Sequence, residues 1–546
     1  MTLLPRIFTD IKPDNVFSVL MIILCFYIFH FYYKHFTRIN PLPGPIPIPL
    51  IGIFRMNIDF NDQVNKLNKI YGHHGIFEFY IAGRRQIVIT KAEYAKKFLA
   101  PSAKDCKIYW KRLPKVELFE DLGIHQRGLT FNVNFNNWKF NRQINIQSIE
   151  KISNSNETIK LLNELFEELS NYWIDINQNN YNSGIIDLTA WTKRFISDLM
   201  FLLSTGKRSF AINYYYRKLK NEKFTKKIMD SEHYIECLTY FLVNLRIAFI
   251  PKILRRLPFI RNHVDKFIDI CNFLFERLLE IVRERREEIE KISNSNNFDM
   301  KQLKDDLLTS FIIANTPYES HPQKSVDSSS VKALNNDEIS SLLFDILSAG
   351  TDSVTSAFSF VLYEIAHHPD VKKKLVDEIN SVFRDDLSRQ ITLDDLEKLK
   401  YCEAIILETL RIRSPTTIFI RYNKEPDEVV GYKWPSNTSF MLHVRGINNN
   451  PLYWEDPDKF MPERFFKPQK TDKLYGFLST SFGAGLRYCP GRKLAMIEMK
   501  LLLALIYRRF DIELVDMKAP LEIFPTVMAI CKKLEARIIP NNQFKF

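Results

Sequence analysis

Cysteine is scarce in this sequence and follows no repeated spacing. Seven cysteines are spread over 546 residues, and the number is odd. Small secreted domains that rely on disulfides carry denser and even sets of cysteines, so the pattern argues against a disulfide framework and favours a reducing compartment. The sequence also lacks an internal repeat, so a solenoid is not expected.

No dense block of basic residues is present, although the formal net charge is +12. Lysines and arginines are distributed along the whole chain, so nucleic-acid binding is not expected. A mildly basic protein can still attract an anionic membrane surface or an acidic protein, because both need only a favourable summed field. With 46% hydrophobic and 26% charged residues, the composition is that of a globular protein and not of a disordered one.

An uncharged run near the amino terminus approaches the length of a membrane span. Residues 16–33 contain no Lys, Arg, Asp or Glu, and about 20 apolar residues cross a bilayer as a helix. We expect a lumenal segment at residues 1–15 and a transmembrane anchor at residues 16–36. Lys34 and Arg38 follow the run without a nearby acid, which places the body in the cytosol because positive flanks stay cytoplasmic. A secretory signal peptide is the alternative, although no small-residue cleavage site follows the run.

The rest of the chain divides into a proline-rich connection and a mainly helical body. Repeated prolines in residues 37–52 favour a stiff, extended strap, and residues 53–546 are expected to form one large domain. Apolar alternation around a Gly-Arg turn in His74–Lys91 predicts a β-hairpin, and a polar segment at residues 315–336 predicts a surface loop. Apolar residues three and four apart predict helices at Leu161–Trp173, Asp265–Ile292 and Asp337–Ala366, and short strands are expected near Glu428–Ser439.

One cysteine lies in a glycine-rich segment that leads into a helical pattern. The segment FGAGLRYCPGR, residues 482–492, is followed by an apolar-periodic run that begins at Leu494. Its glycines permit tight turns and the close approach of a flat ligand. The helix amino terminus and Arg487 are expected to favour the thiolate of Cys489, which is the form that binds metals. The other six cysteines are expected to be inert packing.

The segment resembles the haem-binding loop of cytochromes P-450, whose pattern is Phe-x-x-Gly-x-Arg-x-Cys-x-Gly. The resemblance implies the family's fold, mainly α with a small β subdomain, preceded here by one amino-terminal transmembrane helix. It also implies that Cys489 is the axial ligand of the iron of haem b and that Arg487 pairs with a haem propionate. Phe482 is expected to shield the sulfur and Gly485 to let the haem approach. The fixed positions of the pattern are matched by Phe482, Gly485, Arg487, Cys489 and Gly491.

Two further sets of residues match the family elsewhere in the chain. Glu408 and Arg411 lie three apart on one predicted helix face, a spacing that is common in solvated ion pairs. With Arg464 they resemble the family's buried charge network, which has a structural role beneath the haem. Charge-assisted bonds from arginines and an indole N–H suit the haem propionates, and the family's propionate contacts are matched by Trp138, Arg142 and Arg421.

A long predicted helix carries polar residues in its middle, at Ala349–Thr355. This stretch resembles the family's oxygen-binding groove, which implies catalytic roles for Asp352 and Ser353 in hydrogen bonding to oxygen and in proton relay. Serine stands where threonine is usual and Val354 where a second hydroxyl is common, so Thr355 is a candidate to supply part of the function. A local polar face without chemistry is the alternative.

The resemblance implies a monooxygenase that inserts one atom of O2 into a hydrophobic small molecule. The family receives electrons from a separate flavoprotein, and this chain has no convincing flavin or nicotinamide domain. NADPH and flavins are therefore expected to act only through a partner NADPH–cytochrome reductase, with cytochrome b5 as a further candidate partner. Arg492 and Lys493, next to the cysteine, are expected to contribute to docking. By resemblance to anchored relatives, we expect a single-pass protein of the endoplasmic reticulum membrane with a cytosolic catalytic domain.

Two other functions remain open at this point. A haem-thiolate isomerase or dehydratase acting on hydroperoxides needs neither oxygen activation nor a reductase, and the retained Asp352 and Ser353 argue against it. A membrane protein that binds haem without turnover, as a sensor or carrier, is the alternative from another class. Turnover with a reductase and NADPH separates the three.

Overall fold

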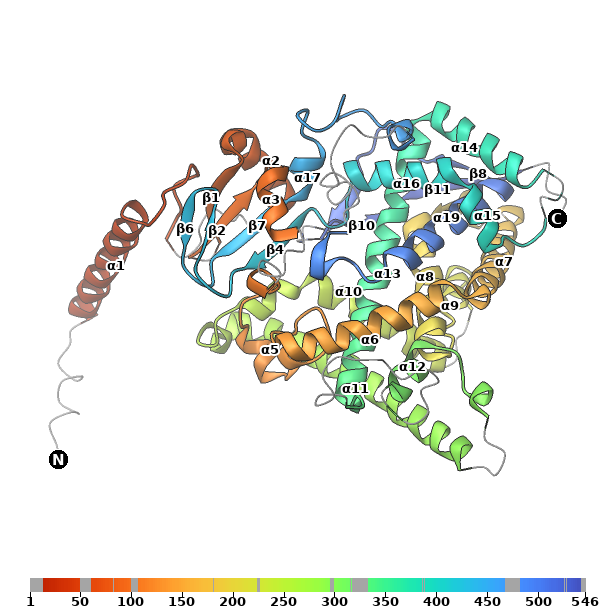
Figure 1. The fold of residues 1–546 in the computed structure, drawn as a ribbon, viewed down its shortest axis with the longest axis horizontal. Helices are drawn as coiled ribbons and strands as arrows, with labels where there is room; N and C mark the ends of the chain where they lie inside the picture. Colours follow the sequence, from red (N-terminus) through yellow and green to blue (C-terminus); the bar gives the residue numbers. More distant parts are fainter. Residues whose placement is uncertain are drawn as a thin grey trace.

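A single helix extends away from the body at the amino-terminal end of the described chain. This helix is α1, Pro13–Phe36, and a sheet-rich part of the body lies between it and the larger helical part (Figure 1). Phe17–Phe36 is long enough and apolar enough to cross a membrane, and most of its large apolar side chains are exposed. The computed structural model describes residues 13–49, 60–81, 83–99, 107–179, 181–222, 226–294, 299–314, 316, 332–384, 386, 388–466, 482–524, 526 and 528–541.

Helices make up the larger part of the body, as the sequence predicts. The three helices expected from apolar periodicity lie within α7 (Asn156–Gln178), α11 (Pro258–Ser293) and α13 (Asn336–His367). Further α-helices are α2 (Phe60–Tyr71), α3 (Ala92–Leu99), α5 (Glu117–Asp121), α6 (Phe135–Ser153), α8 (Leu188–Thr205), α9 (Ala211–Leu219), α10 (Lys226–Val243), α12 (Leu307–Ile313), α14 (Pro369–Val382), α15 (Leu393–Lys398), α16 (Lys400–Ile412), α17 (Val444–Asn448) and α19 (Arg492–Arg509).

The long helix α13 lies at the centre of the helical part and packs against α8, α11, α16 and α19 (Figure 1). Its start is fixed by a capping box: the Asn335 side chain accepts a hydrogen bond from the backbone N–H of Glu338, whose carboxylate accepts one from the backbone N–H of Asn335. A Cβ atom at Gly350 would lie 2.7 Å from Cε of Met200 on α8. That atom is the end of a flexible side chain, so an alanine at this position would require only a shift of the Met200 methyl group.

The sheet-rich part contains the predicted hairpin. Strands β1 (Ile76–Ile81) and β2 (Arg84–Ile89) form an antiparallel pair. Strand β2 also pairs in parallel with β7 (Ser439–His443), and β7 pairs in antiparallel with β4 (Ile418–Tyr422). Strands β5 (Asp427–Val429) and β6 (Tyr432–Trp434) confirm the short strands expected in this region. The other strands are β3 (Ile185–Asp187), β8 (Phe510–Leu514) and β11 (Glu535–Pro540) in one sheet, and β9 (Glu522–Phe524) and β10 (Ile530–Lys533) in another.

The proline-rich connection leads from α1 onto the edge of this sheet. The carbonyl oxygen of Pro43 accepts a hydrogen bond of 2.9 Å from the backbone N–H of Glu78 on β1, so the strap is attached to the body at this point. Residues 50–52, at the end of the predicted strap, lie outside the described residues. The same is true of residues 315 and 317–331, so the polar loop predicted there stays a prediction.

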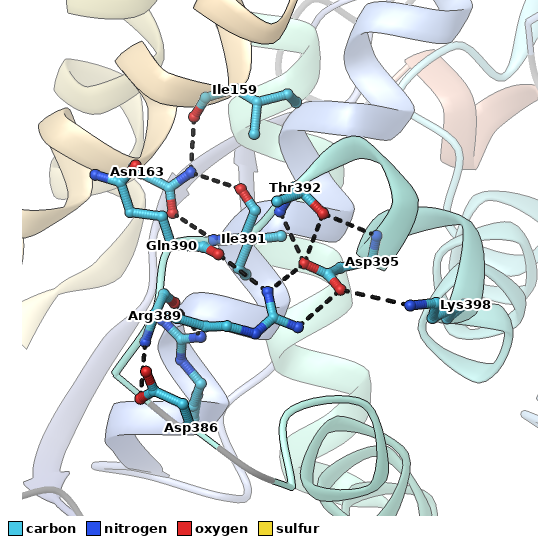
Figure 2. Close-up of polar contacts among 10 residues, drawn as sticks. Ile159, Asn163, Asp386, Arg389, Gln390, Ile391, Thr392, Asp395 and Lys398 are labelled. Atoms are coloured by element: carbon cyan, nitrogen blue, oxygen red, sulfur yellow. Dashed lines mark hydrogen bonds and ion pairs between the residues drawn. The ribbon is translucent and has the colours of Figure 1, made fainter.

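The connection between α14 and α15 is held by side chains, as Figure 2 shows. The amide of Asn163 on α7 donates to the carbonyl of Ile391 (3.0 Å) and accepts from its N–H (3.1 Å). Two nitrogens of Arg389 donate to the carboxylate of Asp395, at 2.6 and 2.9 Å, and Thr392 forms a capping box with the same carboxylate. These bonds fix the start of α15.

Candidate functional site

The predicted metal ligand lies in a tight loop, residues 482–491, that ends at the start of α19. The loop is closed by a 2.8 Å hydrogen bond from the backbone N–H of Cys489 to the carbonyl of Phe482. Gly485 has a φ of +64°, and a Cβ atom there would lie 2.5 Å from the carbonyl oxygen of Leu99. Glycine is therefore required at this position. Gly491 is the N-cap of α19, so Cys489 is close to a helix amino terminus, as expected.

The surroundings of the Cys489 sulfur correct one expectation about its charge. Burial raises the pKa of the thiol, and the N–H of Gly491 and the guanidinium of Arg112 lower it without reversing the rise. Arg487, which was expected to favour the thiolate, points elsewhere and donates to backbone carbonyls. Since a coordinated metal cation deprotonates a thiol outright, this sulfur suits a metal ligand better than a free reactive thiolate.

Four arginines that are far apart in the sequence gather beside this loop, and we call them the arginine cluster: Arg112, Arg142 on α6, Arg421 on β4, and Arg487. Burial lowers the pKa of Arg421 to about 9 and that of Arg142 to about 10, with the positive charge of Arg112 as the next cause. Nη2 of Arg112 donates to the backbone carbonyl of Arg487 at 2.7 Å. Within the described part of the chain, Asp345 is the one carboxylate whose negative charge acts to raise the pKa of both Arg112 and Arg487.

Trp138 on α6 lies beside the arginine cluster and contributes a further hydrogen-bond donor. The Arg487 guanidinium lies 4.2 Å from the centre of a Trp138 ring, and the indole Nε1 is buried without a hydrogen-bond partner among the described residues. Arg487 donates Nε to the carbonyl of Trp110 and Nη1 to that of Leu129, both at 2.8 Å. Each of the four arginines donates at least one bond to a backbone carbonyl. A guanidinium has five N–H groups and no acceptor, so the cluster and Trp138 still have donors for a ligand.

The arginine cluster fits the group that the sequence resemblance implies. Buried charges of one sign are costly unless a counter-charge satisfies them, so four arginines with one nearby carboxylate call for an anionic ligand. Haem b has two propionate carboxylates, which the guanidinium groups and the Trp138 N–H could bind by charge-assisted hydrogen bonds. The Cys489 sulfur, beside the same cluster, could hold its iron.

The middle of α13 presents an accessible face although the helix is otherwise mostly buried. Ala349 is exposed and Ser353 is half-buried, and residues four apart lie on one helix face. The Ser353 hydroxyl donates to the Ala349 carbonyl. Thr355 follows Ser353 by two residues, roughly 200° around the helix, and is buried. The geometry therefore places Thr355 on the opposite side, contrary to the expectation that it shares the role of Ser353.

Asp352, the other predicted catalytic residue, points toward neighbouring helices. Its side chain is buried, with one carboxylate oxygen 3.0 Å from Nζ of Lys193 on α8. The Thr239 hydroxyl on α10 donates to the other oxygen at 3.3 Å. Asp352 and Ser353 are consecutive in sequence but face different surroundings, so a proton can pass between them only by way of mobile water or a side-chain movement.

The predicted charge network is present and buried. Two nitrogens of Arg411 donate to the two carboxylate oxygens of Glu408 at 2.8 Å, and Nε of Arg464 donates to one of them at 2.9 Å. The same oxygen accepts a bond from the backbone N–H of Met461. Both guanidinium groups lie over Trp454, at 5.2 and 5.9 Å from its ring. The network joins α16 to the segment before the cysteine loop.

Comparisons with known proteins agree with these features. The profile of the family described as Cytochrome P450 matches residues 42–539. The chain is 26% identical to tabersonine 6,7-epoxidase isoform 1 of Catharanthus roseus over 516 residues, which cover 93% of each chain. It is 34% identical to cytochrome P450 71A8 of Mentha piperita over 183 residues (33% of this chain, 36% of the relative). For norfluorocurarine oxidase of Strychnos sp the identity is 33% over 189 residues (34% and 36%).

The matches of higher identity span about a third of those relatives' length, whereas the family profile spans most of this chain. The profile thus includes α6, α13, α16 and the cysteine loop together. The chain belongs to the cytochrome P450 family.

Proposed function

We propose that the protein is a haem-thiolate monooxygenase that inserts one oxygen atom from O2 into a hydrophobic small molecule. The observation that carries the proposal is the arginine cluster beside Cys489, three of whose four side chains are buried while Arg112 is half-buried. It is accompanied by the indole N–H of Trp138, which is buried without a hydrogen-bond partner among the described residues. A site with so many donors and so few acceptors is suited to a dicarboxylate cofactor. The accessible face of α13 carries a polar side chain, Ser353, that would be available to such a cofactor.

The residues of the site would have different roles in the reaction. Bound haem would supply the iron that activates oxygen. Cys489 would provide the sulfur ligand, while Trp138 and the arginine cluster would hold the propionates. Ser353 would donate a hydrogen bond on the oxygen side, and Asp352 would accept and release protons from its place beside Lys193.

Several further features support an oxidative, membrane-bound function. Two relatives are named as an oxidase and an epoxidase. Arg492 and Lys493, both exposed at the start of α19, are available to an acidic reductase surface, and reversing both charges should slow reduction by the partner. The apolar helix α1 supports a single-pass anchor, and the flanking charges support a cytosolic body in the endoplasmic reticulum membrane.

The first experiment is the ferrous carbon monoxide spectrum of the full-length protein, of Cys489→Ala and of Cys25→Ala. A strongly red-shifted Soret band in the wild type and in Cys25→Ala, absent from Cys489→Ala, is the expected result. Cys25 lies exposed on α1, so its replacement controls for the loss of any cysteine. A band that persists in Cys489→Ala would remove the basis of the proposal.

Turnover then separates the alternatives. A monooxygenase should consume NADPH and O2 and form product only when a reductase is supplied. Conversion of a hydroperoxide without reductase would identify a haem-thiolate isomerase or dehydratase instead. Haem binding with neither activity, across a broad panel of hydrophobic compounds, would favour a sensor or carrier.

A further inference from the structure

A cavity of about 750 Å³ lies on the body beside the exit of the apolar helix. Its walls come from Ile39 after α1, from the start of β2, from Lys111 and Tyr422, and from residues 434–439 between β6 and β7. In Figure 1, β2, β6 and β7 belong to the part of the body nearest to α1. We call this the anchor-side cavity.

The anchor-side cavity is lined by cations and by no carboxylate among the described residues. Its four basic residues are Arg84, Arg85, Lys111 and Lys115. Two of them are engaged, since Arg85 donates to the carboxylate of Glu78 at 2.7 Å and Lys115 pairs with an exposed glutamate at 2.5 Å. In the part of the chain that the structure describes, Arg84 and Lys111 have no acidic partner.

Lys111 is the most informative of these basic residues because its side chain is half-buried. Burial lowers the pKa of its ammonium group, and no carboxylate opposes this effect. The Tyr422 hydroxyl also lines the cavity and can donate a hydrogen bond. The hydroxyls of Thr438 and Ser439 already donate to the Pro435 carbonyl and to the Gln86 side chain. A cavity of this kind is complementary to a small polar anion, and a phosphate group accepts bonds from both kinds of cation and from hydroxyls.

The anchor-side cavity is distinct from the haem site, although the two share a segment. Lys111 pairs with Tyr422 in an antiparallel bridge, and neighbouring residues in such a pairing point to opposite sides. Lys111 and Tyr422 line the cavity. Their neighbours in sequence, Arg112 and Arg421, point to the opposite side and belong to the arginine cluster. The charge of Lys111 is therefore not explained by haem binding.

We propose that the anchor-side cavity binds the anionic phosphate headgroup of a phospholipid from the membrane that α1 enters. Ile39 lines the cavity and lies three residues after the end of the span, with 69% of its surface exposed. Ile46 and Ile48 nearby are exposed as well. The cavity thus opens where the headgroup layer meets the body, and anionic lipids concentrate around basic groups at that depth. The inference rests on the proposed membrane anchor and is independent of the proposed reaction.

The test uses the full-length protein in nanodiscs of phosphatidylcholine. A short-chain phosphatidic acid is titrated in and followed by calorimetry, with empty nanodiscs subtracted, and inorganic phosphate is titrated in parallel. The variants are Lys111→Gln with Arg84→Gln, and Lys111→Arg alone. The matched control is Lys373→Gln with Arg384→Gln, which removes two exposed charges on and after α14, on the side of the body away from α1 (Figure 1).

The double variant is expected to bind the lipid about 30-fold more weakly, since each cation near a membrane surface contributes about a fivefold factor. Lys111→Arg and the α14 control should bind like the wild type, and inorganic phosphate should bind more weakly than the lipid. Equal lipid affinity in the double variant and the wild type would overturn the site. Inorganic phosphate binding as tightly as the lipid would overturn the membrane as its source. Carbon monoxide spectra of all variants show separately whether the haem site is intact.

Discussion

The ammonium nitrogen of Lys193 on α8 lies 3.0 Å from a carboxylate oxygen of Asp352 on α13. The Asp352 side chain is 3% exposed and that of Lys193 is 17% exposed, so water screens the pair little. Lys193 also donates a hydrogen bond to Thr239, and both partners of Asp352 therefore come from helices that pack against α13. This arrangement gives the carboxylate a counter-charge and keeps it turned away from the face that carries Ser353.

Replacing Asp352 by asparagine should separate binding from proton delivery. We expect Asp352→Asn to retain the thiolate-type carbon monoxide spectrum while product formation with NADPH and reductase falls by about 100-fold, at the low end of what a positioned proton donor contributes. A larger solvent isotope effect on turnover should accompany the loss. Lys193→Gln, which frees the carboxylate without removing it, should lose much less activity. Wild-type turnover in Asp352→Asn would show that protons reach the site by another path.

Glu408 is expected to be indispensable for folding. It accepts bonds from Arg411, Arg464 and a backbone N–H while fully buried. Glu408→Gln leaves two buried guanidinium groups without a counter-charge, which costs about 3–5 kcal/mol of unfolding free energy. The urea midpoint of the haem-loaded protein should fall accordingly, or the variant should fail to accumulate with haem.

A matched variant on the surface shows whether the cost comes from burial. Glu280 on α11 pairs with Arg277 at 2.8 Å, but both side chains are about half exposed. Glu280→Gln should change the unfolding free energy by less than about 0.5 kcal/mol. Similar losses in Glu280→Gln and Glu408→Gln would mean that the buried network has no special role.

Local sequence patterns predict much of this structure because they record local requirements. The cysteine loop needs a left-handed glycine at Gly485 and a helix start after Cys489, and both requirements are visible in consecutive residues. The hairpin at residues 76–89 and the long helix α13 follow from alternation and from apolar periodicity in the same way. The pairing of Glu408 with Arg411 is also local, being less than one helical turn.

Contacts between distant segments could not be predicted in this way. Arg112 lies in the arginine cluster because Lys111 pairs with Tyr422. No local sequence pattern predicts a pairing between residues more than 300 positions apart. Asp345 was also missed, although its carboxylate accepts a 2.5 Å bond from the N–H of Leu129. The direction of Arg487 depends on which carbonyls lie within reach, and that is a property of the packed structure alone.

The arginine cluster predicts an effect on haem retention. Arg421→Gln removes one charge-assisted donor worth about 1.5–3 kcal/mol, so transfer of haem to an acceptor protein such as apomyoglobin should speed up by about tenfold or more. Arg537→Gln, which removes an exposed arginine on β11, should leave the transfer rate unchanged. Equal rates in the two variants would show that Arg421 does not hold the cofactor.

The connection before α15 predicts a pH-dependent contribution to stability. Burial alone would raise the pKa of Asp395, but the bonds from Arg389 and Thr392 outweigh it and bring the pKa from 3.8 to about 2. A carboxyl group whose pKa is lowered by folding stabilises the protein above its unfolded pKa, and that contribution disappears as the pH falls through the folded pKa. At neutral pH the contribution is on the order of 2 kcal/mol.

Asp395→Asn keeps the shape of the side chain but removes its charge, so the variant should be less stable than the wild type by that amount at neutral pH. The difference in urea midpoint should shrink as the pH is lowered from about 4 toward 2, because the wild-type carboxylate is then protonated as well. Asp394→Asn, at the exposed neighbouring position of the same helix, controls for the loss of an acid in the first turn. A constant difference across this pH range would show that Asp395→Asn destabilises the protein through altered packing and not through the lost ion pair with Arg389.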